Sequence, residues 1–143
     1  AESCTGGRIG DRLTDVPGSS DYFLLGVAAY SNAGKMSVLG VPEATLATNG
    51  AVSPETAEAM AVGVRRISGA DVGLSTTGVA GPGGGTPDKP VGTVCVGLAW
   101  AGGSWSRRFD LGDRGREWIK GTTAQMALDS LRRWLLEGGR MPG

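Results

Sequence analysis

The first seven residues, AESCTGG, place two hydroxyl groups and a thiol directly before two glycines. Ser3, Cys4 and Thr5 are therefore candidate nucleophiles. The apolar spacing that follows predicts a helix over residues 6–16, so the stretch lies at a helix N-terminus, where free N–H groups can stabilise an oxyanion. A second interpretation stays open, because Ser and Thr at such a position are also ordinary helix caps.

The chain contains no histidine. This excludes Ser-His-Asp and Cys-His catalytic sets and His-rich zinc sites, and two distant cysteines cannot form a structural zinc site. A serine nucleophile then needs another base, and a lysine can serve when burial or positive charge lowers its pKa. Lys35, and Tyr30 before it, are candidates; a solvated helix lysine and a strand-end aromatic are the plainer interpretation of both.

A glycine-rich segment, VAGPGGGTPDKP, directly follows the strand expected over residues 70–78. It is either a flexible connection or a ligand loop, because α/β sheets bind ligands at strand ends and glycine lets backbone amides approach a phosphate. It matches neither the Walker A pattern nor G-x-G-x-x-G, which excludes ATP hydrolysis of the P-loop type. Arginines near the start of the last helix form either a solvated patch or a phosphate clamp; they are Arg107, Arg108, Arg114 and Arg116.

Hydrophobic periodicity predicts the elements that position these residues. Besides the helix over residues 6–16, helices are expected over 31–40, from Ser53 onward and over 117–137. Ser53-Pro54-Glu55 is a strong helix start, because Ser caps, Pro suits the first position and Glu complements the dipole. Strands are expected over 22–30, 70–78, 91–100 and 104–112, the last two as a hairpin. Together these elements predict an α/β fold with helices on both faces of a mixed sheet.

Composition limits the class of protein. The chain has 143 residues, 40% of them hydrophobic, and 14 basic against 14 acidic residues, which is typical of one soluble globular domain over 1–143. The absence of excess positive charge disfavours nucleic acid as a partner, and no apolar run is long enough for a membrane span. Cys4 and Cys95 are expected to be separate thiols, which favours the cytoplasm. Because the chain begins with Ala rather than Met, we expect its N-terminus to be trimmed.

Several motifs, in order, resemble one known family. They are AESCTGG, LTDVPGSSDYF, AYSNAGK, LGVPEATLATNGAVSPETAEAMA, TGVAGPGGGTPDKPVGTV and GDR. This set is similar to the C-terminal domain of the CinA competence/damage-inducible proteins, which also occurs as a stand-alone nicotinamide mononucleotide (NMN) amidohydrolase. The resemblance covers the chain to about residue 130.

The resemblance implies a three-layer α/β/α sandwich with a mixed, mostly parallel sheet and hydrolysis of the NMN carboxamide to nicotinic acid mononucleotide and ammonia, within pyridine nucleotide (NAD) recycling. It assigns Ser3 as the nucleophile and Tyr30 and Lys35 as its activators. No cofactor and no metal are implied, and self-association to a homo-oligomer is expected. The substrate site implied by the motifs, with the amides and the arginine that we add to it, comprises Cys4, Thr5, Gly6, Thr77, Gly78, Gly81, Gly83, Gly84 and Arg114.

Two positions depart from the family pattern. Ala33 stands where the family usually has Glu, and Trp118 stands where another arginine is typical. Arg116 or Lys120 would then replace the missing arginine at the substrate phosphate. The second hypothesis is therefore a non-catalytic or regulatory nucleotide-binding domain of a larger competence/damage-inducible CinA protein.

Overall fold

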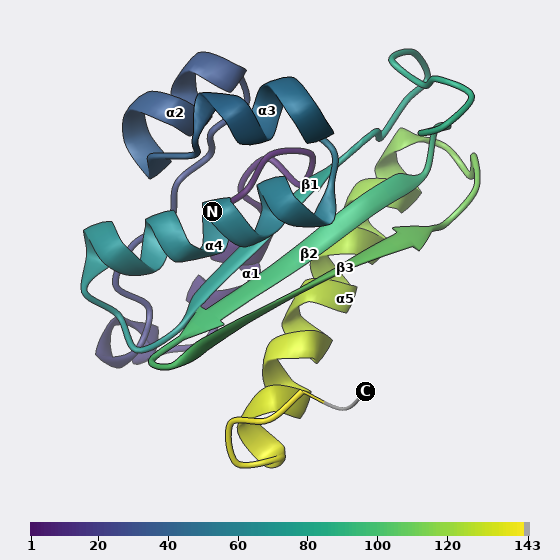
Figure 1. Cartoon of the computed structure of the whole chain (residues 1–143). Coiled ribbons are helices and arrows are strands. Elements are labelled where there is room, and N and C mark those ends of the chain that lie inside the picture. The colour runs from purple at the N-terminus through teal and green to yellow at the C-terminus, as the bar shows by residue number, and fades with distance from the viewer. Residues whose placement is uncertain (142–143) are drawn as a thin grey trace.

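The computed structural model describes residues 1–141 of the chain (Figure 1). Within them, helices and one three-stranded sheet form an α/β arrangement, as the sequence predicts. The elements in order are α1 (Arg8–Thr14), the 3-10 turn η1 (Ser19–Asp21), α2 (Asn32–Leu39), α3 (Glu43–Asn49), α4 (Pro54–Ser68), β1 (Gly73–Gly78), β2 (Thr93–Trp100), β3 (Gly103–Asp110) and α5 (Arg116–Leu136).

The three strands form one sheet in the order β1-β2-β3, with both pairs antiparallel. The expected hairpin is confirmed: β2 and β3 pair from Trp100↔Gly103 onward. Within residues 1–141, parallel pairing is confined to two isolated bridges, which join Glu2 to Ala28 and to Thr76. The sheet is therefore mixed but not mostly parallel, because neither the hairpin turn nor the loop after β1 contains the crossover helix that parallel neighbours require.

Helices cover both faces of this sheet (Figure 1). Helix α4 packs on β1 and β2, with α2 and α3 above it, while α1 and α5 pack together and cover the other face. The central strand β2 is buried at every position before Trp100, as expected for a strand enclosed on both sides. The three-layer α/β/α architecture is thus confirmed.

Helix α4 shows why the sequence pattern succeeds. The Ser53 side chain accepts a hydrogen bond from the Thr56 N–H at 3.1 Å, and Pro54 takes the first helical position. The expected apolar face is buried against the sheet and α2, and it comprises Ala57, Met60, Ala61 and Val64.

Three expectations need correction. The segment 22–30 is not a regular strand, since only Ala28 forms a bridge; its apolar residues have no continuous partner strand. The first helix is α1, which ends at Thr14 and begins at Arg8 instead of residue 6, because Gly6 and Gly7 adopt left-handed conformations. Helix α3 was not predicted, as its seven residues bury only Leu46 and include weak helix formers. No helix within residues 1–141 is long and apolar enough to cross a membrane.

Candidate active site

Ser3 lies where a short extended segment turns into α1. Its N–H donates to the Thr76 carbonyl of β1 at 2.9 Å, and its own carbonyl accepts from the Gly6 N–H at 3.0 Å. Gly6 and Gly7 have φ angles of +61° and +108°. Side chains with a Cβ rarely adopt such angles, so the two glycines permit the tight turn that follows Ser3.

The carboxylate of Glu2 holds this turn against α1. It is 5% exposed and accepts from the N–H groups of Ile9 at 3.0 Å and Gly10 at 3.1 Å, while the Thr5 hydroxyl donates to it as well. These bonds satisfy free donors of the helix N-terminus. Sequence reasoning missed this role, since a carboxylate upstream of the helix is not adjacent to those amides along the chain.

Ser3 and Lys35 form a buried pair. The Nζ of Lys35 lies 3.1 Å from the Oγ of Ser3 and donates to the Ala29 carbonyl, also at 3.1 Å. Lys35 lies in the first turn of α2. Ser31 caps this helix, and its side chain accepts a hydrogen bond from the Gly34 N–H. The exposed fractions are 8% for Ser3 and 2% for Lys35, so the structure brings together two of the three residues expected to be catalytic.

Burial sets the protonation of this site. No carboxylate within residues 1–141 forms an ion pair with Lys35, and removal from water lowers its pKa below 10.5, opposed by the nearby Cys4 sulfur. A lysine so placed is neutral more often than a solvated one and can accept a proton. Burial also raises the pKa of the Cys4 thiol to about 12, so Cys4 stays protonated and packs with Ala80, Val94 and Ile119.

Backbone donors surround Ser3. Among residues 1–141, no carbonyl accepts from the N–H of Cys4 or Thr5. Thr76 directs both its polar groups toward residues 1–3, and since the backbone alternates along a strand, the Gly78 N–H points to the same side. A Cβ at Gly78 would lie 2.7 Å from Val94 and 3.1 Å from Cys4 Sγ, so only glycine allows this close approach. The backbone next to Ser3 therefore has N–H groups that no carbonyl of residues 1–141 engages.

Tyr30 lies at the rim rather than beside the pair. It is 61% exposed, and its hydroxyl accepts from the Arg116 guanidinium at 2.8 Å. The same guanidinium donates to the Gly81 carbonyl at 2.8 Å. Arg116 thus connects Tyr30, 86 residues before it, to the glycine-rich loop. Its position in an arginine cluster did not specify this role.

The remaining predicted residues divide into inward-facing and exposed groups. The side chains of Thr5 and Thr77 are buried and structural: Thr5 bonds to Glu2 and Thr76, and Thr77 donates to the Ala51 carbonyl at 2.7 Å. Gly83 and Gly84 are exposed in the loop after β1. Thr5 therefore reaches a ligand only through its backbone, whereas the loop glycines are open to solvent.

Cationic side chains lie around this loop. Lys89 donates to the Asn49 carbonyl at the end of α3, and Arg108 donates to the Asp88 carbonyl at 3.0 Å. Arg114 stacks on Trp118, with the guanidinium carbon 5.0 Å from the ring centroid. The Nζ of Lys120 would lie 3.8 Å from a Cβ at Gly6, so this lysine points at the turn after Ser3.

A buried serine hydroxyl beside a lysine amine is an arrangement that can serve as nucleophile and base. Residues 1–141 contain no group of three or more His, Cys, Asp or Glu side chains placed to hold a metal. Both cysteines are free thiols, as expected.

Comparison with known proteins agrees with this architecture. The model of the CinA C-terminal domain matches residues 1–135. The chain is 55% identical over 136 residues to a CinA-like protein of Desulfosudis oleivorans and 57% over 137 residues to one of Synechocystis, covering 95% and 94% of this chain and 33% of each relative. It spans about a third of the length of these curated relatives.

Solved structures show the same fold. The competence/damage inducible protein CihA from Agrobacterium tumefaciens superposes with a TM-score of 0.89 at 42% identity, over 92% of this chain and 80% of that one. A CinA superfamily protein from Escherichia coli superposes with a TM-score of 0.87 at 29% identity, over 92% and 76%. The chain therefore belongs to the CinA C-terminal domain family.

Proposed function

We propose that the chain hydrolyses the carboxamide of NMN, releasing nicotinic acid mononucleotide and ammonia. The observation that carries this proposal is the 3.1 Å contact between Ser3 Oγ and Lys35 Nζ in a buried site without histidine. A serine hydroxyl beside a lysine of lowered pKa is an arrangement for acyl transfer. The resemblance of the motifs to NMN amidohydrolases supplies the substrate.

The reaction has two steps. In the first, neutral Lys35 takes the hydroxyl proton as Ser3 Oγ attacks the carboxamide carbon; the C–N bond then breaks and Lys35 returns the proton to the departing ammonia. The product is a nicotinoyl ester on Ser3. In the second step water attacks that ester, Lys35 accepts its proton, and Ser3 leaves protonated. The cationic pyridinium ring makes the carbonyl carbon more electrophilic.

Backbone amides would stabilise the oxyanion of both steps. The N–H groups of Cys4 and Thr5 have no carbonyl partner within residues 1–141, and the Gly78 N–H points to the same side of β1. Donors of this kind are worth about 10²–10³-fold in rate when aimed at the developing charge. The Gly6 N–H, also expected at the substrate site, donates to the Ser3 carbonyl and is the least available of these donors.

The rim would bind the phosphate. Arg114, Arg116 and Lys120 are the cations closest in sequence to the position where the family pattern has the arginine replaced by Trp118. Because the Tyr30 hydroxyl contacts Arg116 rather than Ser3, we assign Tyr30 to positioning this arginine and the substrate. The loop glycines Gly81, Gly83 and Gly84 would complete this wall.

The test is ammonia release from NMN by the purified chain, with Ser3→Ala beside it. Loss of the nucleophile should lower turnover at least about 10⁴-fold without loss of folding. Ser20→Ala, an exposed serine, is the matched control and should keep full activity. Nicotinamide riboside, which lacks the phosphate, should react poorly. Near-full turnover in Ser3→Ala would refute the mechanism.

The second candidate is a nucleotide-binding domain without turnover. The observation that favours it is the stacking of Arg114 on Trp118. In this position the guanidinium contacts the indole ring, although Arg114 was expected to bind the substrate phosphate. Saturable NMN binding by calorimetry, with no ammonia released by the unmodified chain, would select this function instead.

A further inference from the structure

The outer edge of β3 carries a row of open backbone groups. In the sheet order β1-β2-β3 this strand pairs with β2 on one side only (Figure 1). A two-residue turn joins Trp100 to Gly103, so Gly103 and every second residue after it bond to β2. The hydrogen bond from the Leu111 N–H to the Gly92 carbonyl, at 2.9 Å, continues this alternation. The groups that face away from β2 therefore belong to Ser104, Ser106, Arg108 and Asp110.

This row is continuous and unoccupied by other parts of the described chain. Among residues 1–141, no backbone group outside β2 bonds to the N–H or the C=O of these four residues. The pairing of β2 with β3 has no bulge, and β3 contains no proline. A regular open edge of this kind can accept another extended chain as an added strand.

A groove of about 470 Å³ runs beside this edge. Helix α4 packs on β3 from one side of the sheet, whereas α5, on the other side, packs on β1 and β2 and leaves the face of β3 partly open. One wall of the groove is α5, and the other is formed by the alternate β3 side chains Trp105, Arg107 and Phe109. A strand added to β3 would direct every second side chain into this groove.

The groove is positively charged, although the chain has equal numbers of basic and acidic residues. No ion pair within residues 1–141 includes Arg107, and its guanidinium carbon lies 5.4 Å from the centroid of the Phe109 ring. On the α5 wall, the single carboxylate of Asp129 is shared by Arg132 and Arg133. Three arginines thus lie in or next to the groove with one acidic residue, and this charge favours an anionic side chain.

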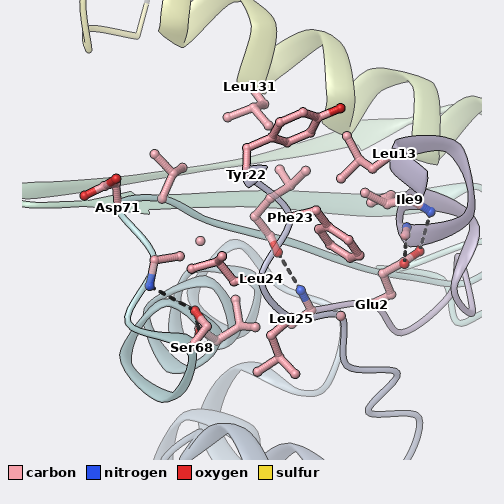
Figure 2. Close-up of a pocket in the computed structure, with 18 of the residues that line it drawn as sticks. Glu2, Ile9, Leu13, Tyr22, Phe23, Leu24, Leu25, Ser68, Asp71 and Leu131 are labelled. Carbon is pink, nitrogen blue, oxygen red and sulfur yellow. Dashed lines mark hydrogen bonds between the residues drawn. The ribbon is translucent and has the colours of Figure 1, made fainter. Parts of the chain in front are cut away.

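The pocket beside β1 has the opposite character (Figure 2). Much of its lining is aliphatic, and its charged side chains are all acidic: Glu2, Asp21 and Asp71. An acidic ligand is therefore attracted to the groove at β3 and repelled from the pocket at β1.

We propose that the edge of β3 binds an extended, acidic peptide segment of a partner protein, which adds to the sheet as an antiparallel strand. The backbone of the segment would bond to the open groups of Ser104, Ser106 and Arg108. Its side chains that face the groove would place a carboxylate opposite Arg107 and β-branched residues opposite Trp105 and Phe109. Opposite charges and aromatic–β-branched pairs are the favourable cross-strand combinations for these three positions.

A second copy of the chain fits this edge less well. Arg107 lies near the middle of β3, so two β3 strands paired antiparallel would bring the Arg107 side chains of both copies close together. Like charges at neighbouring cross-strand positions are destabilising, whereas an acidic segment would pair the same arginine with a carboxylate.

The test uses the peptide Thr-Val-Thr-Glu-Thr-Val-Thr with blocked ends, titrated into the isotopically labelled chain and followed by NMR. Binding with Glu opposite Arg107 should shift the amide signals of Ser104, Ser106 and Arg108, and should slow their hydrogen exchange at least about tenfold. A peptide with Lys in place of Glu should bind about fivefold more weakly. If millimolar peptide left these amides unchanged, the proposal would be wrong.

Methylation of the peptide backbone separates strand addition from simple charge attraction. Methyl groups on the N–H of the Thr residues opposite Ser106 and Arg108 should abolish binding, because these N–H groups face β3. Methyl groups on the two Val N–H groups, which face away, are the matched control and should leave binding in place. Equal binding of the two methylated peptides would contradict strand addition.

Arg107→Glu locates the recognition. This side chain is exposed, so the variant should fold, and it should prefer the Lys peptide to the Glu peptide by about fivefold. Arg66→Glu, an exposed arginine of α4, is the matched control and should keep the preference for Glu. An unchanged preference in Arg107→Glu would overturn the assignment. A chain that dimerises without peptide and thereby protects the outward β3 amides would show that a second copy occupies the edge instead.

This inference is independent of the proposed function. The strands β1 and β2 lie between β3 and Ser3, whose N–H bonds to β1, and none of these readouts involves NMN or ammonia. Failure of peptide binding would therefore leave the proposed amidohydrolase untouched, and loss of that activity would leave the peptide site untouched.

Discussion

The two ends of the candidate site differ in how they are held. Ser3 and Lys35 are 8% and 2% exposed, and their neighbours include backbone groups of β1, of the turn before α1 and of the 22–30 segment. Tyr30 is 61% exposed, and it meets Arg116 through a single hydrogen bond between side chains. The comparison indicates that Ser3 and Lys35 are fixed by the fold, whereas the exposed Tyr30 side chain has fewer contacts that hold it.

Substitution of Lys35 should have the largest effect. Lys35→Met keeps the length of the side chain but removes the base, so ammonia release should fall at least about 10³-fold. The same change should raise the unfolding temperature by ~3 °C, because a buried amine without a carboxylate partner is replaced by an apolar group. Steady-state kinetics and thermal unfolding measure the two effects.

Lys89→Met is the matched control for this loss. Lys89 is half-buried and binds the Asn49 carbonyl, so its removal should lower stability and leave most of the turnover. Equal losses of activity in the two variants would show that Lys35 acts through packing rather than as a base.

The pH dependence should separate the two regions further. Lys35 must be neutral to accept a proton, so kcat should rise with pH and level off below 10.5, since burial lowers the pKa of this lysine. Between the folded and the unfolded pKa the unfolded chain binds more protons, and stability rises with pH there. The stability gained by Lys35→Met should therefore be largest at low pH and shrink toward pH 10.5. A pH-independent gain would contradict this assignment.

Changes at the rim should affect binding more than chemistry. Arg116→Ala removes the contacts to Tyr30 and Gly81 and should raise KM for NMN about tenfold with a smaller change in kcat. Tyr30→Phe keeps the ring but removes the acceptor, so it should show a weaker effect of the same kind. If Tyr30→Phe lowered kcat as much as Lys35→Met, Tyr30 would instead be assigned to the activation of Ser3.

The smallest effect is expected at the thiols. Burial raises the pKa of Cys4 and of Cys95 to about 12, so neither forms a thiolate at neutral pH. Iodoacetamide should leave the folded chain unlabelled and fully active, although Cys4 is adjacent to Ser3. An exposed thiol introduced by Ser20→Cys is the positive control, and labelling followed by mass spectrometry measures all three sites.

The sequence predicts those parts of the fold that local signals define. Ser53, Pro54 and the apolar face of α4 were identified correctly because capping and periodicity act within a few residues. The 22–30 segment was misassigned because its apolar composition suits a strand while only Ala28 finds a partner. The prediction of a mostly parallel sheet was also wrong, since the direction of strand pairing depends on contacts between residues distant in sequence.

The same limit applies to the candidate site. Ser3 and Lys35 were singled out by residue type and by the absence of histidine, and the fold places them in contact. The link from Arg116 to Tyr30 spans 86 residues, and no local pattern distinguishes that arginine from its neighbours. The hydrogen bonds of Glu2 could not be predicted from the sequence either. Only the fold buries this carboxylate and places it against the N–H groups of α1.

Glu2 has a consequence for interpreting mutational scans. A carboxylate directly before the proposed nucleophile resembles a member of a catalytic triad, and substitutions at Glu2 should abolish the proposed activity much as those at Ser3 do. Its oxygens, however, are occupied by Thr5 and by the amides of Ile9 and Gly10. A loss of activity on substitution of Glu2 would therefore reflect displacement of α1. Activity scores at this position would measure how well the structure around Ser3 is held, and not a chemical role of the carboxylate.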